Sequence, residues 1–104
     1  MAITAVSRWK GNQEETSRIA REIAPILKRH GAVSVRWGPC HAGAYAGQMF
    51  AAIIFQDWAT YGRAMHALSE DAAYQRLYAE ALKIGELQER SVIVTQELGS
   101  QADR

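Results

Sequence analysis

The sequence has few of the features that would assign it to several common classes of protein. Among its 104 residues there is one cysteine, and the formal net charge is only +1. Because Cys40 has no partner within the chain, an internal disulfide is excluded, as is typical of proteins from a reducing compartment. The small net charge gives no electrostatic basis for binding nucleic acid or an anionic membrane.

Long hydrophobic runs are missing as well. No apolar run approaches the roughly 20 residues that a helix needs to span a bilayer, and the first residues lack the charged and then hydrophobic pattern of a signal peptide. We therefore expect a cytoplasmic protein without membrane or nucleic-acid partners. The length is that of one domain, which we expect to cover residues 1–98, followed by a polar tail at residues 99–104.

The most informative stretch is the apolar segment GQMFAAIIFQ at residues 47–56. Side chains of a β-strand alternate between its two faces. The odd-numbered residues from Met49 to Phe55 therefore share one face, the even-numbered residues from Phe50 to Ile54 share the other, and both faces are apolar. A strand of this kind is expected in the middle of its sheet, covered on both sides.

Two helical segments are predicted after this strand. Asp57 can cap the first of them, and apolar side chains then recur at spacings of three and four, at Trp58, Tyr61, Met65 and Leu68. Ser69-Glu70-Asp71 interrupts this stripe with residues suited to a new helix N-terminus. The second segment ends at Gly85 and presents one inward face, formed by Tyr74, Leu77, Tyr78 and Ala81.

The remaining elements complete an order of β-α-β-β-α-β. We predict a strand at Ile3–Trp9, a helix from a capping Asn12 to about His30 with Pro25 inside it, and a strand at Val33–Trp37. Residues 38–46 form either a long hairpin loop or a bulged extension of the preceding strand, and a last strand is predicted at 87–98. This order indicates an α+β, ferredoxin-like antiparallel sheet with both helices on one face.

The sheet face without helices has no cover within so short a chain. A second copy of the chain is the simplest way to cover this face. We therefore expect a homodimer in which two sheets pack face to face into a closed or nearly closed barrel.

One stretch resembles a known superfamily. Phe55-Gln56-Asp57-Trp58, Tyr61, His66-Ala67-Leu68-Ser69 and Ala73-Tyr74-Gln75 are similar to the strand-to-helix segment of the dimeric α+β barrel superfamily, in particular its antibiotic-biosynthesis-monooxygenase-like and NIPSNAP-like branches. The resemblance implies a dimeric barrel with an apolar pocket and a monooxygenase-like activity, without cofactor, on an aromatic or polyketide-like molecule. The alternative is a non-catalytic ligand-binding or structural dimer of the NIPSNAP-like kind.

Candidate site residues follow from this resemblance and from the predicted elements. Monooxygenase-like members often carry a histidine near the position of His66, where an imidazole could act as a base; a surface histidine is the alternative. Aromatic walls of a pocket could come from Trp58, Trp9 and Trp37, although core or interface packing explains these residues too. A substrate anion could be held by arginines in the predicted strands, Arg8, Arg36 and Arg90, unless they simply face solvent.

The sequence lacks the residues that nucleophilic catalysis, metal binding, haem degradation or RNA binding would need. Cys40 and His41 are adjacent, so on an extended chain their side chains point apart and do not form a nucleophile and base or a metal-chelating pair. The related haem-degrading enzymes carry an axial histidine late in the second helix, where this chain has Tyr74 and Tyr78. The central strand has almost no positive charge, which disfavours an RNA-binding module. We expect no metal and no cofactor.

Overall fold

The computed structural model describes residues 1–99 and has the predicted order of elements. The strands are β1 Ala2–Gly11, β2 Ser34–Pro39, β3 Met49–Phe55 and β4 Gly85–Thr95; the helices are α1 Gln13–Arg29, α2 Trp58–Ser69 and α3 Ala72–Ile84. All strand pairs are antiparallel, in the order β2-β3-β1-β4. The α+β, ferredoxin-like fold is thus confirmed. Apart from Gly99, the predicted polar tail lies outside the described residues.

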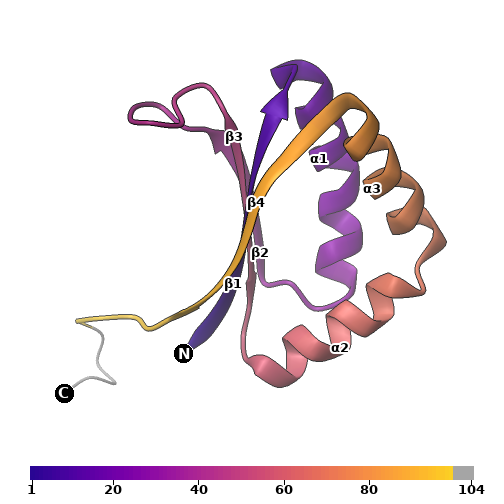
Figure 1. Cartoon of the computed structure of the whole chain (residues 1–104). Helices are drawn as coiled ribbons and strands as arrows, with labels where there is room; N and C mark the ends of the chain where they lie inside the picture. The colour runs from indigo at the N-terminus through magenta and orange to yellow at the C-terminus, as the bar shows by residue number, and fades with distance from the viewer. Residues whose placement is uncertain (100–104) are drawn as a thin grey trace.

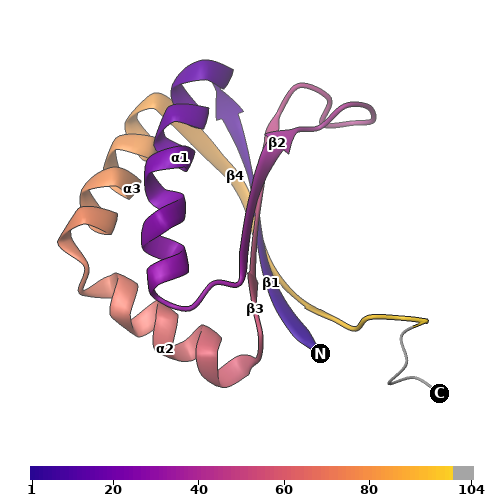
Figure 2. The same cartoon turned by 180° about the vertical axis from the view of Figure 1, so that it is seen from behind.

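The three helices lie on one side of the sheet and leave the other side uncovered (Figures 1 and 2). β3 lies between β2 and β1, as its composition predicted. Ile53 is opposite Ala5 of β1 and Val35 of β2, and this row faces the helices. Because side chains alternate, Ile54 and its row face the uncovered side, which we call the open face.

The core lies between the helices and the sheet. Ile3 and Phe55 are opposite each other on neighbouring strands, and both are fully buried. Each helix contributes buried side chains to this cluster, which include Ile19, Ile26, Leu27, Ala64, Leu68 and Leu77. Asn12, Asp57 and Asp71 cap the three helices with their side chains, as the sequence indicated.

Several strand boundaries differ from the prediction: β1 extends to Gly11, β2 extends to Pro39, and β4 ends at Thr95. β2 begins at Ser34, and Val33 before it is 63% exposed. β4 begins at Gly85, which is also the C-cap of α3, so no loop separates the two elements. Gly85 pairs with Gly11, and a Cβ atom at Gly85 would lie only 3.0 Å from the carbonyl oxygen of Lys10. This close backbone approach explains how the chain passes directly from helix to strand.

The connection between β2 and β3 is a long hairpin loop, one of the two predicted alternatives. The amide of Cys40 donates to the carbonyl of Gln48 at 2.8 Å, and the amide of Gly47 donates to the carbonyl of Cys40 at 2.9 Å. These bonds close the loop at its base beyond the last β2 residue, Pro39. Pro25 lies well inside α1, where the prediction placed it.

Candidate functional site

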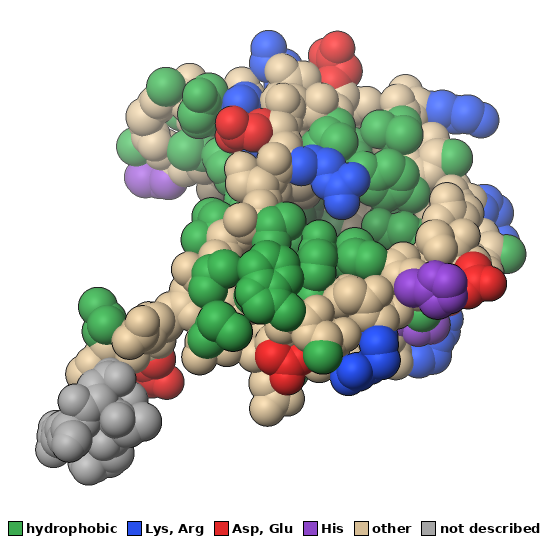
Figure 3. Space-filling view, turned by 60° about the horizontal axis from the view of Figure 1, so that its bottom comes forward, with side chains coloured by type: hydrophobic (Ala, Val, Ile, Leu, Met, Phe, Trp, Pro, Cys, Tyr) green, Lys and Arg blue, Asp and Glu red, His purple; other side chains and the backbone are tan. Residues whose placement is uncertain are grey.

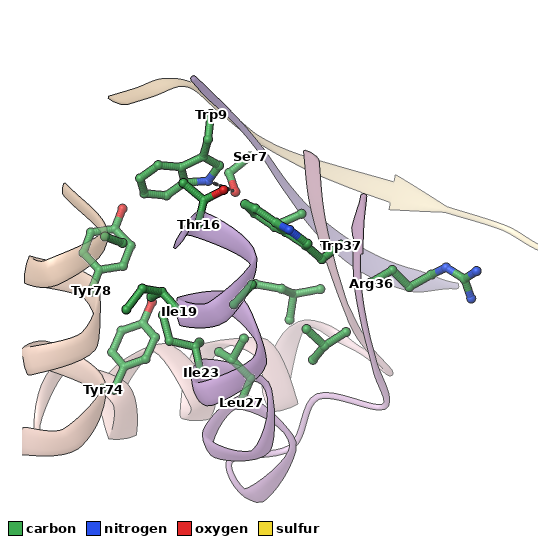
Figure 4. A pocket seen from close by; sticks show the side chains of 15 residues that line it. Ser7, Trp9, Thr16, Ile19, Ile23, Leu27, Arg36, Trp37, Tyr74 and Tyr78 are labelled. Atoms are coloured by element: carbon green, nitrogen blue, oxygen red, sulfur yellow. Dashed lines mark hydrogen bonds between the residues drawn. The ribbon is translucent and has the colours of Figure 1, made fainter. Parts of the chain in front are cut away.

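A cavity of about 90 Å³ lies between the helices and the sheet and is partly open to solvent. Its walls come from α1, α3 and the strands β1, β2 and β3 (Figure 4). Trp9 and Trp37 line it from β1 and β2, and Tyr74 and Tyr78 line it from α3. Aliphatic side chains of α1 and the sheet complete the walls. The cavity is therefore apolar, with four aromatic side chains around it.

The two tryptophans have their polar atoms occupied within the protein. The indole Nε1 of Trp9 donates to Ser7 Oγ at 2.9 Å, and that of Trp37 donates to Ser17 Oγ at 2.8 Å. Since a buried indole N–H requires a partner, these serines fix the orientation of both rings. The tryptophans thus offer the cavity apolar surface and no free N–H group.

The two tyrosines contribute hydroxyl groups to the wall, which also contains Ser7 and Thr16. Their ring centroids are 5.8 Å apart, and the ring of Tyr78 meets Trp9 edge to face at 6.0 Å. Burial, together with the neighbouring Tyr78, raises the pKa of Tyr74, so its phenol remains protonated at neutral pH. Sequence reasoning placed both tyrosines on the inward face of the helix but did not assign them to the site. Their spacing of four residues, on a helix facing the sheet, was the available signal.

Asp71 fixes the start of the helix that carries these tyrosines. Its Oδ1 accepts the amide of Tyr74 at 3.0 Å, and its Oδ2 lies 2.8 Å from His30 Nε2 and 3.0 Å from Arg29 Nη2. The hydrogen bond with His30, assisted by the Tyr74 amide and by Arg29, lowers the pKa of Asp71 to about 2. The side chain that begins α3 is therefore an ionised carboxylate at neutral pH.

The three candidate arginines do not converge on the cavity. Arg36 touches its rim, but the guanidinium points away from the cavity into solvent (Figure 4). Arg8 lies on the open face, where its guanidinium is 3.7 Å from the ring centre of Tyr45 and donates to Gln48 Oε1 at 2.7 Å. Arg90 is exposed on β4 and does not line the cavity. Its positive charge acts on Tyr74, where it opposes the rise in the pKa of the phenol.

The structure does not bring His66 or Trp58 to the cavity. The side chain of His66 is 79% exposed, and its Nε2 lies 2.9 Å from Glu70 Oε1. The buried face of α2 is formed by Ala64 and Leu68, and a residue two positions from each lies about 200° around the helix. Trp58 is 50% exposed and meets Tyr61 edge to face. The expectation that His66 borders the pocket is therefore corrected.

The hairpin loop carries the only cysteine. Cys40 Sγ donates to the carbonyl of Ala42 at 3.2 Å, and His41 is exposed. Within residues 1–99, no three side chains of His, Cys, Asp or Glu gather in a way that could hold a metal ion. No helix in the same range is long and apolar enough to cross a membrane.

Residues 1–94 match the model of the family described as "Domain of unknown function (DUF6854)". The chain belongs to this family. A comparison with curated proteins gives no match.

Solved structures share the fold over almost the whole chain. A mutant form of SnoaB, a cofactor-independent oxygenase from Streptomyces nogalater, has a TM-score of 0.73 at 14% identity, with 95% of this chain and 98% of that chain covered. An uncharacterized NIPSNAP domain protein from Burkholderia xenovorans also has a TM-score of 0.73, at 13% identity and with 97% and 100% covered. A dimeric ferredoxin-like protein from an uncultured marine organism has a TM-score of 0.66 at 10% identity, with 92% and 98% covered. The resemblance to the monooxygenase-like and NIPSNAP-like branches is thus confirmed for the fold.

Proposed function

We propose that the chain forms a cytoplasmic homodimer that binds a small apolar or aromatic molecule between its sheet and its helices. The observation that carries this proposal is the cavity bounded by Trp9, Trp37, Tyr74 and Tyr78. Apolar cavities with a few well-placed polar groups are the usual form of small-molecule sites. A free cysteine, Cys40, fits a reducing compartment.

The uncovered side of the sheet supports the homodimer. On this side β3 presents Phe50, Ala52 and Ile54, and no helix lies over them. Ile93 of β4 lies in the same row as Ile54 on this side and is 46% exposed. Hydrophobic side chains also gather across the middle of the surface seen in Figure 3. Apolar surface of this kind is commonly buried against a partner. The dimeric ferredoxin-like neighbour gives a precedent within the fold.

The reaction that we propose is a cofactor-independent oxygenation, by analogy with SnoaB, which has the same fold. Without a cofactor, the organic substrate must supply the electrons. The balanced form is conversion of an activated ring CH₂ group to a carbonyl, in which one oxygen atom of O₂ enters the product and the other leaves as water. Tyr74, protonated at neutral pH, would donate a hydrogen bond to the developing oxygen anion.

A second candidate is ligand binding without catalysis, as in the NIPSNAP-like alternative. It is favoured by one specific observation: among the described residues, no His, Asp, Glu or Lys lines the cavity. Proton abstraction from a substrate by a side chain of the cavity therefore lacks an ordinary base.

Isotope labelling distinguishes the two candidates. The protein is incubated with a set of phenols and aromatic ketones under ¹⁸O₂, and the products are analysed by mass spectrometry. Oxygenation predicts a product that gains one ¹⁸O atom, with a rate that falls in the Trp37→Ala variant, because Trp37 forms part of the cavity wall. Binding without any labelled product favours the non-catalytic candidate. The exposed Trp58→Ala variant is the matched control, since Trp58 lies outside the cavity.

A further inference from the structure

The volume of the cavity limits the size of its ligand. An enclosed apolar cavity of about 150 Å³ is sufficient to bind benzene, and this cavity measures about 90 Å³. A single ring can be accommodated because the cavity is partly open to solvent. A fused ring system exceeds this volume further, so its second ring would have to displace side chains of the wall or remain in the opening, where less of its apolar surface is buried.

The charges around the cavity limit the charge of its ligand. The only ionisable cation among the lining residues is Arg36, and its guanidinium points away into solvent (Figure 4). Arg8 lies on the other face of the sheet, bound to Gln48. Arg90 of β4 acts on Tyr74 through its charge, which opposes the rise in the pKa of that phenol, but it is exposed and does not line the cavity. A carboxylate inside the cavity would therefore lose its hydration without gaining a directly paired charge, which is unfavourable. The cavity should select an uncharged molecule.

The polar groups of the wall indicate what the ligand carries. The indole N–H groups of both tryptophans are occupied by serines. The hydroxyl groups of Tyr74 and Tyr78 have no hydrogen-bond partner among residues 1–99, although Tyr74 is half-buried. Neither hydroxyl oxygen is among the fully buried polar atoms without a partner, so both remain accessible to solvent, and a ligand oxygen can replace water as their partner.

From these three limits we infer that the cavity binds an uncharged, single-ring aromatic molecule whose hydroxyl or carbonyl oxygen is held by Tyr74 and Tyr78. This inference rests on the proposed function, in that the cavity must be a ligand site. It narrows the ligand class, because polycyclic and anionic aromatic molecules are expected to bind less tightly.

The test compares four probes, chosen so that p-cresol alone combines a neutral charge, a single ring and a hydroxyl group. They are p-cresol, which is neutral with one ring and a hydroxyl; toluene, which lacks the hydroxyl; benzoate, which is an anion; and 2-naphthol, which adds a ring. Binding is followed by NMR titration of the three tryptophan indole N–H signals. Those of Trp9 and Trp37 should shift, and that of Trp58 should not, because Trp58 lies outside the cavity. We expect p-cresol to bind about fivefold or more tightly than each other probe.

Variants identify the groups that hold the oxygen. In the double variant Tyr74→Phe with Tyr78→Phe, p-cresol should bind no better than toluene, while toluene binding reports that the cavity is intact. If the double variant does not fold, the single variant Tyr78→Phe is used in its place. Its preference for p-cresol over toluene should lie between that of the native protein and none. Tyr61→Phe is the control, because Tyr61 packs on Phe55 and does not line the cavity.

The possible results separate this inference from the proposed function. Equal affinity for p-cresol and toluene, or affinity for benzoate or 2-naphthol as high as for p-cresol, overturns the inference while leaving a ligand site in place. Failure of all four probes to shift the Trp9 and Trp37 signals contradicts both. Binding of p-cresol in the expected order without ¹⁸O incorporation supports the inference and rejects only the oxygenase activity.

Discussion

His30 Nε2 lies 2.8 Å from Asp71 Oδ2, and this contact joins the end of α1 to the start of α3. The other oxygen of Asp71 accepts the amide of Tyr74, whose side chain lines the cavity. One carboxylate thus connects the packing of two helices to the wall of the candidate site. Its ionisation should affect both the stability of the fold and the position of the tyrosines.

The pH dependence of stability tests this contact. The pKa of Asp71 is about 2 in the folded protein, below its ordinary value of 3.8. A lowered folded-state pKa means that the stabilisation is complete above about pH 4 and is lost as the pH falls toward about 2. Asp71→Asn should therefore lower the urea midpoint at about pH 6, with the difference from the native protein disappearing near pH 2. Circular dichroism measures both titrations.

The control for this experiment is Glu22→Gln. Glu22 is half exposed and pairs with Arg18 on the surface of α1, where an ion pair contributes little. This variant should follow the native protein at each pH. If Asp71→Asn is equally destabilised at about pH 2 and pH 6, the ionised carboxylate is not the stabilising species.

Arg8 is expected to hold the hairpin loop against the open face. Its guanidinium stacks on Tyr45 and bonds Gln48, and both residues lie in the loop. These two contacts together should contribute about 1–2 kcal/mol to loop closure. In Arg8→Met, the amides of Cys40 and Gly47, which close the loop, should exchange with deuterium about tenfold faster. Hydrogen-exchange mass spectrometry measures this rate.

Arg36→Met is the matched variant for the loop experiment. Arg36 is on the same face of the sheet but exposed, and its guanidinium extends into solvent. Its loss should leave the exchange of the loop amides unchanged. Equal acceleration in both variants would point to a general loss of stability in place of a specific anchor.

The order of elements and the central position of β3 were predictable from apolar alternation and capping residues. Which face of β3 meets the helices was not, because Met49, Ile53 and Phe55 are no more apolar than Phe50 and Ile54. Register decides it: β3 pairs with β1 so that Phe55 is opposite Ile3, beneath the helices. The register between strands that are far apart in the sequence cannot be predicted from the residues of either strand alone.

The candidate site was partly predictable. Trp9 and Trp37 were named from their strands, and both line the cavity. His66 was chosen from a family resemblance, although the apolar stripe that includes Met65 and Leu68 already placed it away from the core. Periodicity was the better guide to its position. The unpaired hydroxyls of Tyr74 and Tyr78 depend on which partners surround them, and only the structure shows those neighbours.

The catalytic role predicted for His66 can be tested directly. Because its side chain is 79% exposed and bound to Glu70, we expect His66→Ala to leave both p-cresol binding and any ¹⁸O incorporation unchanged. The measurement is the steady-state rate at which ¹⁸O from ¹⁸O₂ enters the product. A loss of about 10²-fold, the usual scale for a general base, would restore His66 to the site and require the helix to move toward the cavity.

The neighbouring residues Ile53 and Ile54 provide the sharpest test of the homodimer. Both are partly buried in the single chain, but Ile53 lines the cavity under the helices and Ile54 lies on the open face. Ile53→Glu places a charge in the core, at a cost of several kcal/mol, which is a large part of the usual 5–15 kcal/mol of stability. We therefore expect this variant to be unfolded by circular dichroism.

Ile54→Glu places the same charge where only a second copy of the chain would cover it. This variant should retain its secondary structure, and light scattering should give it the mass of a monomer, 11.5 kDa. The native protein should give the mass of a dimer at micromolar concentration. The pair isolates the interface because side-chain chemistry, strand and backbone environment are the same and only the face differs. A native protein that scatters as a monomer, or an Ile54→Glu variant that remains dimeric, would place the contact between copies elsewhere or remove it.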